Sequence, residues 1–84
     1  MRFSAFGQDF GSASLSGDVT DPAGAAVVGA DVTAQSKPTG VAHSAITNGT
    51  GLFVLNGLPP GDYEVRIVSK GFGPTVVQVR LEVG

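Results

Sequence analysis

The sequence predicts an all-β fold, a β-sandwich or small barrel of roughly seven short strands. Apolar and polar residues alternate with a period of two in several segments, which is typical of strands with one buried face. The 84 residues include 13 glycines and 5 prolines, which favour tight turns and disfavour helices. Turn signals recur about every 8–12 residues, and no segment has a convincing helical period.

Residues 1–14 are predicted to form a flexible N-terminal tail, and residues 15–84 the folded domain. Ser4-Ala5-Phe6-Gly7-Gln8 has the small residues of a signal-cleavage region, although no complete signal peptide follows Met1. We therefore expect the natural chain to begin upstream of Met1 and to be exported.

The first predicted strand alternates from Leu15 to Thr20, and the turn Asp21-Pro22-Ala23-Gly24 ends it. Proline presets φ in such a turn, and glycine accepts a left-handed backbone. The second strand is expected to bury its apolar positions, which are Val28, Ala30, Val32 and Ala34. A loop at residues 36–40 and a weakly patterned edge strand at residues 41–47 are expected next.

The stretch from Asn48 to Val65 alternates turns and strands. Asn48-Gly49-Thr50-Gly51 predicts a turn, and the strand after it is expected to bury Phe53 and Leu55. Gly57 to Gly61 turns the chain again, and Leu58 is available to close one end of the sandwich. A further strand begins at Tyr63, whose hydroxyl needs a partner. Residues 69–74 are predicted as a loop, and the last strand is expected to bury Val77, Val79, Leu81 and Val83.

Composition and charge argue against several classes of function. The net charge is -2, and the five lysines and arginines are scattered, so no basic stripe predicts nucleic-acid binding. No apolar run approaches the ~18 residues of a membrane-spanning helix, so we expect no membrane insertion by this domain. The chain has no cysteine, which removes disulfides and cysteine zinc sites.

The residues also argue against catalysis and a bound cofactor. His43 is the only histidine, so the chain cannot assemble a Ser-His-Asp triad, a Cys-His pair or a multi-histidine zinc site. Four oxygen-bearing side chains leave calcium open as an alternative, but their spacing is not that of an EF-hand and suits turn hydrogen bonds better: Asp18, Asp21, Asp31 and Asn48. We expect no metal.

Three segments together resemble the carboxypeptidase regulatory-like domain. They are S-G-D-V-T-D-P-A-G-A-A-V-V-G-A-D-V-T-A, T-N-G-T-G-L-F-V-L-N-G-L-P-P-G-D-Y-E-V and K-G-F, and the resemblance covers about Leu15 to Val83. It implies a transthyretin-like, Greek-key β-sandwich, close to the Cna B-type and starch-binding-like folds. The fold follows from this resemblance more firmly than any function does.

The resemblance implies a non-catalytic accessory module of a larger bacterial protein that is secreted or in the cell envelope. The chain looks most similar to the N-terminal domain of outer-membrane proteins that resemble TonB-dependent receptors. We therefore expect an extracytoplasmic location, and docking, spacing or recognition toward other domains of the same polypeptide or another envelope protein. Two alternatives remain open: a carbohydrate-binding module, and a regulatory domain beside a metallocarboxypeptidase.

Three residues are candidate contacts for a ligand or partner: Phe72, Lys70 and His43. Phe72 is expected in a loop beside Lys70, where an aromatic face would suit a sugar ring or would instead cap the core. His43 is expected on a polar strand, where an exposed, solvated imidazole is the simpler interpretation.

Overall fold

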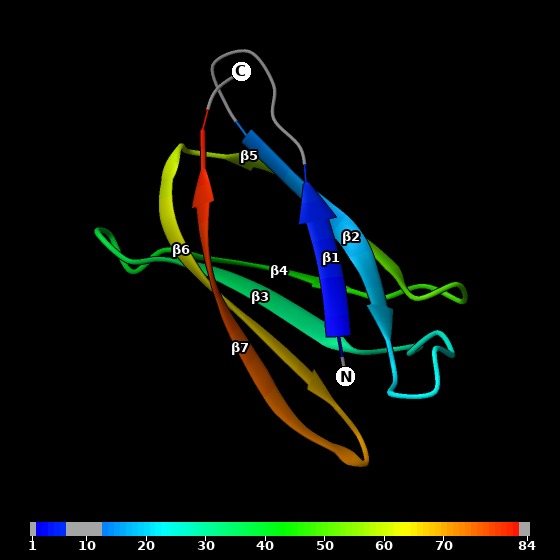
Figure 1. The fold of residues 1–84 in the computed structure, drawn as a ribbon. Helices are drawn as coiled ribbons and strands as arrows, with labels where there is room; N and C mark the ends of the chain where they lie inside the picture. The colour runs from blue at the N-terminus through cyan, green and yellow to red at the C-terminus, as the bar shows by residue number, and fades with distance from the viewer. Residues whose placement is uncertain (1, 7–12, 83–84) are drawn as a thin grey trace.

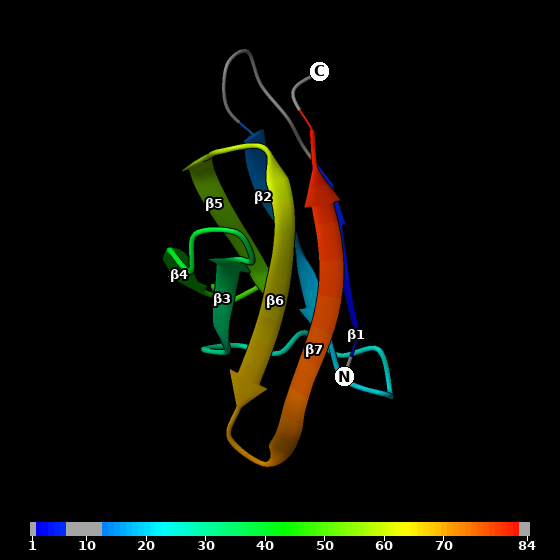
Figure 2. The same cartoon turned by 90° about the vertical axis from the view of Figure 1, so that its left-hand side faces the viewer.

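Two antiparallel sheets face each other across one apolar core in the computed structural model, which describes residues 2–6 and 13–82 (Figures 1 and 2). The strands are β1 (Arg2–Phe6), β2 (Ala13–Thr20), β3 (Asp31–Ser36), β4 (Ala42–Ile46), β5 (Leu52–Leu58), β6 (Gly61–Ser69) and β7 (Phe72–Leu81). One sheet has the strand order β1-β2-β5, and the other has the order β4-β3-β6-β7. The predicted all-β sandwich is confirmed.

The chain crosses between the sheets in a Greek-key path. β3 and β4 form a hairpin in one sheet, β5 pairs with β2 in the other, and β6 then returns to pair with β3. This return beside the first strand of the group is the connection that defines a Greek key. It places the β3–β4 loop and the β5–β6 turn close enough to share a pocket.

The core consists of the inward-facing residues of both sheets, as the period-two patterns predicted. Alternate positions on β5 are buried and exposed, so Phe53 and Leu55 point inward while Leu52 and Val54 face solvent. Leu58 is fully buried, as expected of a residue that closes the sandwich. The buried apolar residues are Ala13, Leu15, Val19, Val27, Ala30, Val32, Ala34, Phe53, Leu55, Leu58, Tyr63, Val65, Ile67 and Leu81.

The N-terminal residues differ from the prediction. Residues 2–6 form β1 instead of a tail, and β1 pairs antiparallel with β2 from Arg2 opposite Thr20 to Phe6 opposite Ser16. β2 itself begins at Ala13, two residues before the predicted domain boundary. The physical reason is that β2 is a central strand whose second edge needs backbone partners, and β1 supplies them. Residues 7–12 of the predicted tail lie outside the described part of the chain.

Two further expectations are corrected. Val28 is 60% exposed, and its neighbour Val27 is buried in its place, because the residues before β3 form a turn in which the alternation does not hold. The predicted loop at residues 69–74 is only a turn at Lys70-Gly71, since Gly71 has a φ of 86° and lets the chain reverse tightly. β7 therefore starts at Phe72. Of the core positions predicted on this strand, Leu81 is buried, Val77 and Val79 are only partly buried, and Val83 lies outside the described residues.

Candidate functional site

A pocket of about 260 Å³ lies between the β3–β4 loop and the Pro59-Pro60 turn. Its walls combine three prolines and a valine with two hydroxyl side chains, an imidazole and a phenol: Ser36, Pro38, Thr39, Val41, His43, Pro59, Pro60 and Tyr63. We call it the end pocket. A concave, mainly apolar site with a few polar groups is the usual form of a small-ligand site.

Tyr63 fixes one wall of the end pocket. Its ring is buried in the core, and its hydroxyl donates a 2.6 Å hydrogen bond to the carbonyl oxygen of Pro59. Burial raises the pKa of the Tyr63 hydroxyl above its ordinary value, so the phenol stays protonated and remains a donor at neutral pH. The Pro-Pro turn is thus tied to β6, and the partner that the sequence required for this hydroxyl is confirmed.

Backbone hydrogen bonds hold the opposite wall. The Ser36 amide donates to the Val41 carbonyl at 2.8 Å, and the Gly40 amide donates to the Ser36 carbonyl at 2.8 Å. The Lys37 amide donates to the Asp62 carbonyl at 3.0 Å, which attaches the loop to the start of β6. Both walls of the end pocket are therefore anchored on β6.

His43 lies in this pocket and is half-buried, which differs from the exposed imidazole expected from the sequence. It is directly opposite Ala34, whose side chain is fully buried, so His43 occupies an inward-facing position on β4. β4 is the edge strand of its sheet, as predicted, and the imidazole at that edge remains partly accessible. His43 can exchange hydrogen bonds with a ligand.

Phe72 and Lys70 lie at a different place, at the β6–β7 turn (Figure 1). Phe72 is 38% exposed and lies opposite Ser69, so its ring belongs to the start of a strand and only part of it is available. His43 lies in the register row that passes through Val65 of β6. That row is four residues from Ser69, roughly 13 Å along the strand. The three predicted contact residues therefore do not form one site.

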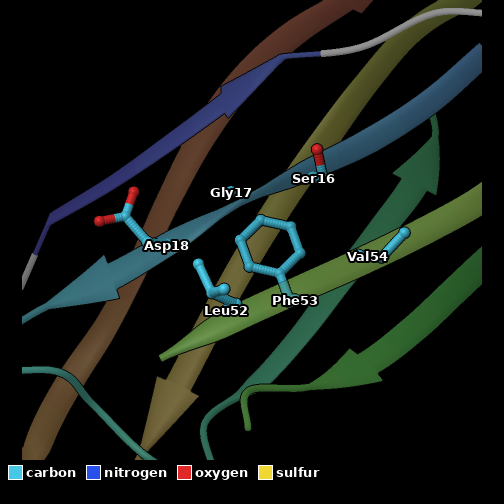
Figure 3. Close-up of a pocket in the computed structure, with 6 residues that line it drawn as sticks. All are labelled: Ser16, Gly17, Asp18, Leu52, Phe53 and Val54. Carbon is cyan, nitrogen blue, oxygen red and sulfur yellow. The ribbon is translucent and has the colours of Figure 1, made fainter. Parts of the chain in front are cut away.

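A second depression crosses β2 and β5 (Figure 3). Its volume is about 280 Å³, and its lining is Ser16, Gly17, Asp18, Leu52, Phe53 and Val54. Gly17 lies opposite Phe53, between the rows Ser16–Val54 and Asp18–Leu52. The depression is therefore the furrow between two neighbouring rows of a pleated sheet, and it holds one carboxylate beside apolar walls.

Two of the four oxygen-bearing side chains considered for calcium, those of Asp21 and Asn48, serve their own turns. One carboxylate oxygen of Asp21 accepts hydrogen bonds from the amides of Ala23 and Ala25, both at 2.9 Å. The amide oxygen of Asn48 accepts from the backbone amide and hydroxyl of Thr50 and from the Leu52 amide. The turn interpretation is confirmed for Asp21 and Asn48, whereas Asp18 lies in β2 and Asp31 begins β3. Within residues 2–6 and 13–82, no three His, Cys, Asp or Glu side chains cluster as a metal site would require.

The end pocket was missed by sequence reasoning, although Pro59, Pro60 and Tyr63 were recognised as scaffold residues. Their pattern predicts a rigid turn, but it does not reveal which other loop lies beside that turn. The Greek-key return of β6 to β3 brings Pro38 and Val41 to it. A correct strand order would have revealed that the two walls of the end pocket lie side by side.

Fold and site together define a β-sandwich domain with a small pocket at one end. The chain belongs to the family of the carboxypeptidase regulatory-like domain, whose family model matches residues 14–84. Domains of this family are non-catalytic. No curated protein and no solved structure gives a significant match. Among the described residues, no helix is long and apolar enough to cross a membrane.

Proposed function

We propose that this chain is a non-catalytic accessory domain of a larger extracytoplasmic protein. Its role is docking, spacing or recognition toward other domains of the same polypeptide or another cell-envelope protein. The observation that carries this proposal is the family match over residues 14–84. The end pocket and the open strand edges supply surfaces through which a domain without its own chemistry can act.

Cell fractionation tests this proposal directly. An antibody raised against the 84-residue chain is used to probe envelope, secreted and cytosolic fractions of the source organism. The expected result is a band in the envelope or secreted fraction, at a mass well above that of 84 residues. A cytosolic band at the mass of 84 residues would contradict both the accessory role and the location. A larger band that contains a metallocarboxypeptidase catalytic domain would favour the regulatory alternative.

A second candidate function is carbohydrate recognition, and the end pocket favours it at His43 instead of at Phe72. The pocket combines apolar ring surfaces at Pro38, Pro59 and Pro60 with the imidazole of His43. A sugar needs both kinds of surface, because its ring faces are apolar and its edges carry hydroxyls.

An NMR titration with neutral mono- and oligosaccharides tests this second function. Chemical-shift changes confined to the end pocket and lost in His43→Ala would support it. Phe72→Ala is the matched control, since Phe72 lies outside the pocket. Changes centred on Phe72 would move the sugar site to the β6–β7 turn, and no changes with any sugar would leave the protein-docking role alone.

A further inference from the structure

The direction of each backbone hydrogen bond in the four-stranded sheet can be followed from one contact. The Lys37 amide donates to the Asp62 carbonyl at 3.0 Å, in the same register as Ser36 opposite Tyr63. In an antiparallel ladder, residues alternate between facing one neighbouring strand and facing the other. Even-numbered residues of β6 therefore direct their backbone groups toward β3, and odd-numbered residues direct theirs toward β7.

The same alternation continues into β7. Gly61 lies opposite Leu81, and Val65 lies opposite Val77, so the odd-numbered residues of β7 hydrogen-bond to β6. The amides and carbonyls of Val76, Gln78 and Arg80 then point away from the sheet. β7 is the last strand in its sheet, and no described strand pairs with that side.

The open edge of β7 has a defined length. Pro74 is the next outward-facing position by the same alternation, and proline has no amide hydrogen to donate there. The usable edge is therefore the seven residues 75–81. Of the other described edge strands, β4 and β1 are shorter with five residues each, and β5 has seven, as many as the usable edge. Edge strands often carry lysine as protection, and residues 75–81 include none.

Residues 75–81 are nearly self-complementary about Gln78. When two copies run antiparallel with Gln78 opposite itself, Val77 of each copy lies opposite Val79 of the other on the inner face. Both valines are only half-buried in the single chain, and the added strand would cover them further. On the outer face, Arg80 lies opposite Val76, so no like charges meet and the arginine stem can cover the valine.

Moving the centre of the pairing by two residues toward the C-terminus removes this match. With Arg80 opposite itself, two like charges meet at the centre of the pairing and only residues 78–82 overlap among the described positions. With Gln78 at the centre, all seven residues of the usable edge are paired.

We propose that the edge of β7 at residues 75–81 pairs antiparallel with β7 of a second copy of this chain, about a twofold axis at Gln78. The two four-stranded sheets then join into one continuous sheet. This pairing does not depend on the end pocket or on the accessory role, and each can fail separately.

Analytical ultracentrifugation of the 84-residue chain tests the pairing. A seven-residue strand contact is at the small end of specific interfaces, so a dissociation constant of roughly 10–500 µM is expected. The weight-average mass should therefore rise toward that of a dimer as the concentration approaches about 1 mM. A chain that remains monomeric at that concentration would overturn the proposal.

Charge variants at Gln78 test the register. Gln78→Arg and Gln78→Glu each place like charges opposite one another, so each alone should weaken the dimer by about tenfold or more. An equimolar mixture of the two should recover a dimer at least as strong as the original, because opposite charges then meet. A mixture that stays monomeric would overturn the twofold at Gln78.

Ser44→Arg on β4 is the matched control, because it adds the same charge at an exposed outward position of the opposite edge strand. It should leave the dimer unchanged, and a loss equal to that of Gln78→Arg would mean that the pairing is not at β7. Gln78 is exposed and its side chain does not enter the core, so each variant is expected to fold. Circular dichroism checks this.

Discussion

Gly51 is the position at which adding one methyl group should destabilise the domain most clearly. Its φ is 76°, a left-handed conformation, and a β-carbon placed there would lie 2.7 Å from the carbonyl oxygen of Val19 and 3.2 Å from the β-carbon of Ala26. The Val19 carbonyl cannot move freely, because it accepts a 2.9 Å hydrogen bond from the Val27 amide. Gly51 itself accepts from the Val19 amide at 2.8 Å.

The magnitude for Gly51→Ala follows from two separate costs. A left-handed backbone costs alanine about 1–2 kcal/mol relative to glycine. A methyl group forced against fixed backbone adds roughly 1–3 kcal/mol. The sum is about 2–5 kcal/mol, against a total stability of roughly 4–13 kcal/mol for a domain of this length. The melting temperature should fall by about 10 °C or more.

Two other glycines separate these costs. Gly57 has a φ of 70°, and a β-carbon there would meet nothing within 4 Å, so Gly57→Ala should show the backbone cost alone. Gly49 has neither a positive φ nor a neighbour within 4 Å, so Gly49→Ala should be close to neutral. Urea denaturation of the three variants gives the free energies of unfolding. Equal losses for Gly51→Ala and Gly57→Ala would refute the steric part of this reasoning.

Three further predictions concern the core and the end pocket. Phe53→Ala should lower the free energy of unfolding by roughly 3–5 kcal/mol in urea denaturation, because the ring is 3% exposed, and a near-normal value would mean that its inward face is assigned wrongly. Thr47→Val removes a hydroxyl that accepts a hydrogen bond from one buried amide at 2.9 Å and donates one to a carbonyl at 2.7 Å. The free energy of unfolding should therefore fall by about 1–3 kcal/mol, and an unchanged melting temperature would contradict this. The raised pKa of Tyr63 means that the folded state holds this proton more tightly than the unfolded state, so the contribution of Tyr63 to stability should be constant below about pH 10 and fall above it. Tyr63→Phe should reduce that fall in a series of melts at increasing pH, and an unchanged profile would exclude Tyr63 as its cause.

The sequence was informative where alternation and turn chemistry coincide. The burial pattern alternates from Leu52 to Leu55 on β5 and from Asp62 to Val68 on β6, and both strands lie between glycine-rich turns, so inward residues such as Phe53 and Tyr63 could be predicted. Leu58 was also predictable, because a large apolar residue directly before a Pro-Pro turn has few places to go except the core.

β1 could not be predicted, because its existence depends on a partner edge that local pattern does not reveal. Residues 2–5 alternate polar and apolar side chains, but so short a run does not predict a strand alone, and what holds residues 2–6 is the unpaired side of β2. The prediction of a loop at residues 69–74 was wrong for a related reason. Glycine and proline mark a break in the pattern, but the left-handed Gly71 closes the turn in two residues and the strand resumes at Phe72. The end pocket required the strand order, since its two walls are far apart in sequence.

The placement of β1 and β7 has a mechanical consequence. Both strands run in the same direction, β1 in one sheet and β7 in the other, so the start of β1 and the end of β7 lie at opposite ends of the sandwich (Figure 1). Tension between these two ends acts along the strands. It would slide β1 past β2 and β7 past β6, so that many backbone hydrogen bonds bear the load at once instead of opening one at a time. A domain loaded in shear in this way keeps its length under force.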